Sequence, residues 1–110
     1  MDMVIKNAIE AVRAELEDLQ ISLSDAKAER KGIRQAISGG NAIVSLIESY
    51  HGFEWADKIG SETSQQIVNE LVKREAWLDR EISRFKEAIK ARTVSLTKYE
   101  MMAEAENQDA

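Results

Sequence analysis

The sequence predicts an all-α protein, an antiparallel helical hairpin of coiled-coil type with a short helix capping its closed end. No Gly or Pro interrupts residues 1–31 or 61–110, and all five glycines lie between positions 32 and 60. Nearly half of the residues are Ala, Glu, Lys, Leu or Arg, which is typical of long helices. In both long segments, apolar residues recur at alternating steps of three and four. We therefore expect two long helices joined by a glycine-rich centre, in a single domain over residues 1–110.

The first long helix is expected over residues 3–37, because its apolar stripe is regular over about five heptads. We expect it to end at Gly39, which can adopt the left-handed conformation that follows a last helical turn. One polar residue, Arg30, interrupts the stripe. The stripe consists of Ile5, Ile9, Val12, Leu16, Leu19, Leu23, Ala26, Arg30, Ile33 and Ile37.

The other long helix is expected over residues 62–103, with Ser61 or Thr63 as its N-cap and a frayed tail over 104–110. One extra step of four, from Leu78 to Ile82, is a stutter that locally unwinds a supercoil. Its stripe consists of Ile67, Leu71, Arg74, Leu78, Ile82, Phe85, Ile89, Arg92, Leu96 and Tyr99.

The centre of the chain contains two further short helical segments. Asn41 can cap a helix over residues 42–50, which Gly52 ends. Residues 53–59 form one more helical turn, which Gly60 ends. We expect the short helix over 42–50 to pack across the closed end of the hairpin.

Blocks of charge predict that the two long helices run antiparallel within one chain. Residues 1–25 carry a net charge of −4 and residues 73–98 one of +4, and folding the chain back places these blocks side by side. In the predicted register Lys6 pairs with Glu100 and Lys27 with Asp79. Each exposed pair contributes only about 0–1 kcal/mol, so the pairs set the register more than the stability.

A hairpin of two helices has a thin core, so we expect association into a homo-oligomer. Ile21 lies away from the apolar stripe and is available for such contacts. The last helix also carries a second row of mostly small residues beside its stripe, which another helix could approach. This row consists of Trp77, Arg84, Ala88, Ala91 and Ser95.

The residue types present argue against catalysis, and we expect no enzymatic activity and no cofactor. The chain has no Cys and one His, His51, so neither a Cys-based zinc site nor a His cluster can form. No motif positions a catalytic triad or a phosphate-binding loop. The net charge of −5 makes nucleic-acid binding an unfavoured alternative. No apolar run is long enough for a membrane span, and no secretion signal is visible, so we expect a cytoplasmic protein.

Aromatic residues gather in the glycine-rich centre. Two interpretations remain open: the rings plug the closed end of the hairpin, or they form a patch that binds a protein partner, since aromatic anchors are enriched at interfaces. The candidate partner-binding residues are Tyr50, His51, Phe53, Trp55 and Trp77.

Basic residues near the same end form a candidate anion site, which would include two stripe arginines at similar heights in the hairpin. In one interpretation their stems pack while their charged ends pair with Glu29, Glu70 or Glu75. In the other they bind an acidic protein segment, a nucleotide or a nucleic-acid phosphate. The candidate anion-binding residues are Lys27, Arg30, Arg34, Lys73 and Arg74.

The sequence thus favours a non-enzymatic helical module for protein–protein interaction. We expect an adaptor, a chaperone-like subunit or a small inhibitor, of the kind found among phage or mobile-element accessory proteins. Its partners would be itself and another protein. One alternative is an oligomer that binds an anion or nucleotide through the Arg/Lys cluster. The other is a nucleic-acid-associated protein that uses the basic face of the last helix.

Overall fold

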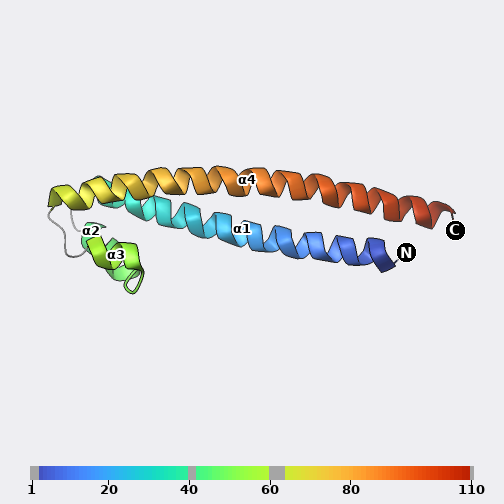
Figure 1. The fold of residues 1–110 in the computed structure, drawn as a ribbon, viewed down its shortest axis with the longest axis horizontal. Coiled ribbons are helices and arrows are strands. Elements are labelled where there is room, and N and C mark those ends of the chain that lie inside the picture. The colour runs from blue at the N-terminus through green and yellow to red at the C-terminus, as the bar shows by residue number, and fades with distance from the viewer. Residues whose placement is uncertain (1–2, 40–41, 60–63, 110) are drawn as a thin grey trace. The chain divides into compact units, whose positions relative to one another are not determined.

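The computed structural model describes residues 3–39, 42–59 and 64–109. The chain forms four helices, α1 (Met3–Ile37), α2 (Ala42–Ser49), α3 (Glu54–Ile59) and α4 (Ser64–Asp109), and the described residues contain no strand (Figure 1). The long helices α1 and α4 run in opposite directions and pack against each other, and the short helices follow α1 at the turn (Figure 1). This arrangement confirms the predicted all-α helical hairpin.

The end of α1 is formed as predicted. Gly39 has a φ angle of +106°, and its N–H donates a hydrogen bond to the Ala36 carbonyl at 3.0 Å. Ser38 N–H donates to the Arg34 carbonyl at 3.2 Å. These bonds satisfy carbonyls that the last turn of a helix leaves without an intrahelical partner.

The last helix continues to Asp109, beyond the predicted end at residue 103. Residues 104–109 contain no Gly or Pro to end the helix, and Ala103 is buried, so the preceding turn is fixed by packing. The predicted N-caps Asn41, Ser61 and Thr63 lie outside the described residues.

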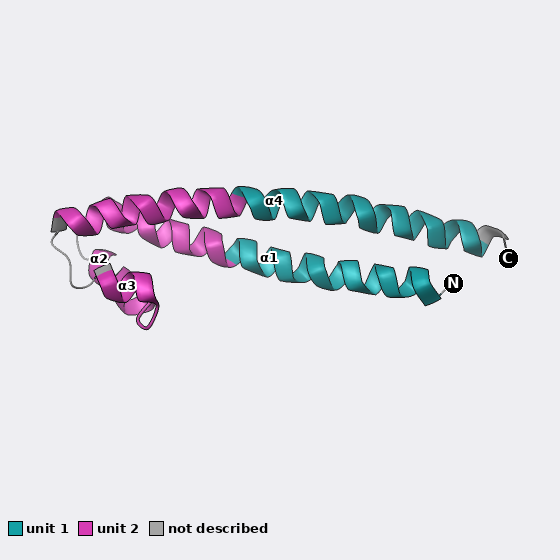
Figure 2. Cartoon of the chain, viewed as in Figure 1, with its two compact units in different colours: residues 1–24, 83–110 teal, residues 25–82 magenta. Residues whose placement is uncertain are grey.

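The hairpin divides into two compact units (Figure 2). Unit 1 comprises residues 1–24 and 83–110, and unit 2 comprises residues 25–82. In unit 1 only the two long helices pack, and its buried apolar residues are Ile9, Val12 and Ala103. In unit 2 the long helices are joined by α2 and α3.

The core of unit 2 is shielded from solvent. Ile33 and Leu71 are completely buried, and Leu78 almost so; all three are stripe residues of the predicted hairpin. The short helices contribute Leu46 and Ala56 to this core. α2 approaches α1 closely at Gly32, where an added Cβ atom would lie 3.2 Å from Leu46 Cδ1. The short helices therefore cover the apolar stripe here, as the prediction of a capping helix requires.

The predicted charge register is corrected by the observed ion pairs. Glu100 pairs with Arg13 at 3.3 Å rather than with Lys6, and Asp79 pairs with Arg30 at 3.0 Å rather than with Lys27. In both cases the carboxylate pairs with an arginine instead of the predicted lysine. The arginine side chain is long and has several N–H donors, so it can bind a carboxylate that is not directly opposite it on the facing helix.

Candidate protein interaction surfaces

Arg74 on α4 lies at the centre of a cluster of interacting side chains in unit 2. Its Nε atom donates a hydrogen bond to Glu29 Oε1 at 2.9 Å, and its Nη2 atom forms an ion pair with the same oxygen at 2.8 Å. Its guanidinium lies 4.2 Å from the ring centre of Trp77 and 5.2 Å from that of Trp55. The Glu29 side chain is only 13% exposed. The arginine thus neutralises a largely buried carboxylate and makes cation–π contacts with both tryptophans of the chain.

Three of the predicted aromatic residues meet beside this cluster. The Tyr50 ring lies 5.7 Å from Phe53 in an edge-to-face contact and 5.3 Å from Trp55 in a tilted one. Burial raises the pKa of Tyr50, and the carboxylates of Glu29 and Asp25 raise it further against a lowering by Arg74. The phenol therefore stays protonated at higher pH than usual.

The segment between α2 and α3 is fixed by local hydrogen bonds. Gly52 has a φ angle of +94°, and its N–H donates to Asp57 Oδ1 at 3.1 Å. Phe53 N–H donates to the Tyr50 carbonyl at 3.0 Å, and Asp57 N–H donates to the Phe53 carbonyl at 3.0 Å. This turn reverses the chain and sets the position of Phe53.

The aromatic residues divide by exposure. Tyr50 and Trp55 are half-buried, as the interpretation that the rings plug the closed end would require. The Nε1 atom of Trp55 is buried and has no hydrogen-bond partner among the described residues. Phe53 and Trp77 are 57% and 41% exposed, and His51 is exposed as well. These three are the most accessible to a partner among the five predicted residues.

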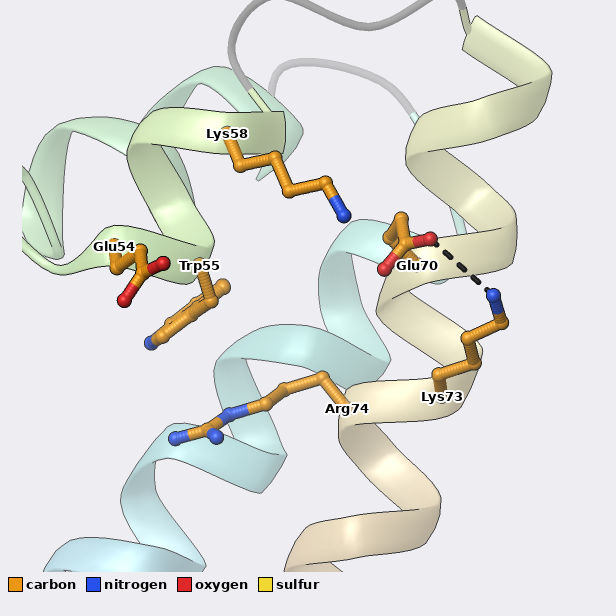
Figure 3. Close-up of a pocket in the computed structure, with 6 residues that line it drawn as sticks. All are labelled: Glu54, Trp55, Lys58, Glu70, Lys73 and Arg74. Carbon is orange, nitrogen blue, oxygen red and sulfur yellow. Dashed lines mark hydrogen bonds and ion pairs between the residues drawn. The ribbon is translucent and has the colours of Figure 1, made fainter.

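A hollow of about 480 Å³ lies between α3 and α4. Its lining consists of Glu54, Trp55, Lys58, Glu70, Lys73 and Arg74. Figure 3 shows Lys58 reaching from α3 towards Glu70, which also pairs with Lys73 at 3.3 Å. Figure 3 also shows Arg74 extending towards Trp55, away from Lys73. The cations of this hollow therefore do not converge on one point.

The structure divides the predicted anion site into two groups. Lys73 and Arg74 line the hollow just described. Lys27, Arg30 and Arg34 line another of about 280 Å³, with Lys31, Gln35 and Ser38. Arg30 pairs with Asp79 at 3.0 Å, and Arg34 lies 3.5 Å from both Glu75 and Asp79.

The basic side chains are mostly neutralised within the chain. All three arginines pair with carboxylates: Arg74 with Glu29, Arg34 with Glu75 and Asp79, and Arg30 with Asp79. Glu70 pairs with Lys73. Glu29, Glu70 and Glu75 are the carboxylates that one of the two interpretations named. Lys27 and Lys31, in contrast, have no carboxylate partner among the described residues. The second hollow is thus the one with uncompensated positive charge.

Unit 1 leaves several large apolar side chains in contact with solvent. Most of its stripe residues are only partly buried, and six other large apolar residues are at least half-exposed: Met3, Val4, Ile21, Val94, Met101 and Met102. A hollow of about 560 Å³ also opens between the two helices, lined by Lys6, Ile9, Glu10, Arg13, Glu100, Ala103, Glu104 and Asn107.

Sequence reasoning missed two features of these surfaces. The stacking of Arg74 on Trp77 had a signal, because residues three apart share a helix face. Its contact with Trp55 had none, because the packing of α3 places that ring. The close approach at Gly32 also had a signal, since an isolated glycine within a helical pattern often marks a packing requirement.

Comparison with protein-family models, with curated proteins and with solved structures finds no match to this chain. Among the described residues, no group of three or more His, Cys, Asp or Glu side chains is placed to hold a metal ion. No described helix combines the length and apolar character needed to cross a membrane. The surfaces themselves are therefore the basis for assigning a function.

Proposed function

We propose that this protein is a non-enzymatic helical interaction module that works as a homo-oligomer, as an adaptor, chaperone-like subunit or small inhibitor does. The supporting observation is a contrast between the two units. In unit 2 the stripe residues Ile33, Leu71 and Leu78 are completely or almost completely buried. In unit 1 Ile9 and Val12 are buried, but Leu16, Ile89 and most other stripe residues are only partly buried. An apolar strip left open along a hairpin favours association.

Sedimentation equilibrium over a wide range of protein concentration tests this proposal. A single chain has a mass of 12.4 kDa, and we expect a mass of at least twice that value, falling only on dilution. A monodisperse 12.4 kDa species at every concentration would refute the homo-oligomer.

Binding to a second protein is the other part of this proposal. Phe53 and Trp77 support it, because they are the large exposed aromatic side chains described in unit 2. The variant Phe53→Ala/Trp77→Ala should keep the oligomer mass, since neither residue belongs to unit 1. A change in mass would show that these rings serve self-association instead.

Anion binding remains the second candidate, and one observation favours it. Lys27 and Lys31 have no carboxylate partner among the described residues and line one hollow with Arg30 and Arg34. Calorimetric titration with pyrophosphate should show binding that Lys27→Glu/Lys31→Glu abolishes. Absence of heat with pyrophosphate and with ATP would remove this candidate.

A further inference from the structure

The two helices of unit 1 present a face large enough for a dimer interface. Residues 3–24 of α1 span about 33 Å at 1.5 Å per residue, and two helices side by side are about 18 Å wide. One face of this size offers about 600 Å² per copy, so two copies would bury about 1,200 Å², the lower end for specific interfaces. The half-exposed stripe residues are Ile5, Leu16, Leu19, Leu23, Phe85, Ile89, Leu96 and Tyr99.

In the middle of unit 1, most of the exposed, unpaired charges of the two helices have opposite signs. On α1, Glu10, Glu17 and Asp18 are exposed and have no ion-pair partner in the part of the chain that the structure describes. On α4, the same is true of Lys86, Lys90 and Lys98. Within unit 1, the ion pairs that do join the helices are Arg13–Glu100 and Arg92–Glu15. Over these stretches α1 therefore offers unpaired carboxylates, and α4 offers three unpaired ammonium groups beside one unpaired carboxylate, Glu87. Towards the open end the signs are reversed, with Lys6 on α1 and Glu104 on α4.

The ion pair between Glu15 and Arg92 indicates which of these charges lie near one another along the hairpin. Because α1 and α4 are antiparallel, a step of two residues forward from Glu15 on α1 runs alongside a step of two residues backward from Arg92 on α4. These steps lead to Glu17 and Lys90. By this pair Glu17 lies near the level of Lys90, yet they form no ion pair within the chain as described. Each is available to a charge of opposite sign at the same height on another molecule.

We infer that a second copy of this chain covers unit 1, with α1 of each copy packed against α4 of the other. This inference rests on the proposed homo-oligomer and adds the arrangement of the copies. Packing α1 against α4 brings Glu17 of each copy to Lys90 of the other, in two equivalent contacts related by twofold symmetry. Packing α1 against α1 would instead oppose two helices that are both net acidic over residues 3–24.

Two charge reversals and their mixture test this arrangement. In a dimer of Glu17→Lys alone, or of Lys90→Glu alone, both symmetric contacts become repulsive. We expect each variant to dimerise about tenfold more weakly or worse, given about 0.2–1 kcal/mol for each exposed pair. In the heterodimer of the two variants both contacts are attractive again, so the mixture should regain the wild-type dissociation constant.

The readout is sedimentation equilibrium of each variant and of the equimolar mixture, with circular dichroism to verify helicity. Arg80→Glu is the control, because Arg80 is exposed on α4 but belongs to unit 2, outside the proposed interface; it should leave the dissociation constant unchanged. A wild-type monomer would refute the homo-oligomer itself. If neither charge reversal changes the dissociation constant, or if the mixture does not regain the wild-type value, only the pairing of α1 with α4 is refuted.

Discussion

Replacement of Arg74 by alanine should remove much of the stability of unit 2. The variant loses hydrogen bonds to a charged group, worth about 1.5–3 kcal/mol, and cation–π contacts worth about 0.5–1 kcal/mol each when partly exposed. It also leaves Glu29, only 13% exposed, without this guanidinium. Since the Arg74 side chain is itself 25% exposed, solvent screens part of the loss. We expect the free energy of unfolding to fall by about 3 kcal/mol.

Urea unfolding followed by tryptophan fluorescence measures this loss, because both tryptophans of the chain contact Arg74. Protein concentration must be held constant, since association adds to the apparent stability. Arg80→Ala is the matched control: Arg80 is exposed, and its loss should change the stability by less than about 0.5 kcal/mol. Arg74→Lys keeps the charge but loses the planar fork, so its loss should be intermediate.

A double-mutant cycle with Glu29→Gln separates the ion pair from the ring contacts. If the pair carries most of the effect, Arg74→Ala will cost much less in the Glu29→Gln background. The reasoning is refuted if Arg74→Ala is as mild as Arg80→Ala in the wild-type chain. It is also refuted if tryptophan fluorescence of the folded state is unaltered by the loss of Arg74.

Three other predictions concern packing, backbone conformation and pH. Leu71→Ala should cost about 2–5 kcal/mol in urea unfolding because Leu71 is completely buried, whereas Val72→Ala next to it, at an exposed site, should cost less than about 1 kcal/mol. Gly39→Ala should lower the stability by about 1 kcal/mol through its positive φ alone, since no atom lies within 4 Å of the added Cβ; an unchanged melting temperature would contradict this. The raised pKa of Tyr50 means that its contribution is complete below pH about 10 and is lost as the pH rises through the folded-state pKa. Thermal melts from pH 8 to 11 should therefore show a steeper decline for the wild type than for Tyr50→Phe, and parallel declines would refute the assignment.

The hairpin could be predicted from the sequence because its determinants are local and periodic. Ile33, Leu71 and Leu78 were placed on the apolar stripes by spacing alone, and all three are in the core of unit 2. Gly39 was likewise identified from its position after the last apolar residue, and its φ angle confirms the helix end. Such features depend on residues a few positions apart, which sequence pattern reports directly.

The candidate surfaces were less predictable because they depend on contacts between distant segments. Spacing suggested that Lys27 would pair with Asp79, whereas Arg30 and Arg34 take that carboxylate. One cluster of five cations was expected, and the helices place them around two hollows. The choice among nearby partners is decided by side-chain reach and by the angle of packing, neither of which a one-dimensional pattern contains.

The narrow space above Gly32 links two positions of the chain that lie on different helices. A methyl group there would press on the end of Leu46, so a larger residue at position 32 requires a smaller one at position 46. Divergent versions of this protein should therefore exchange volume between the two sites instead of varying each freely. A designer who wished to enlarge one would have to trim the other in the same step.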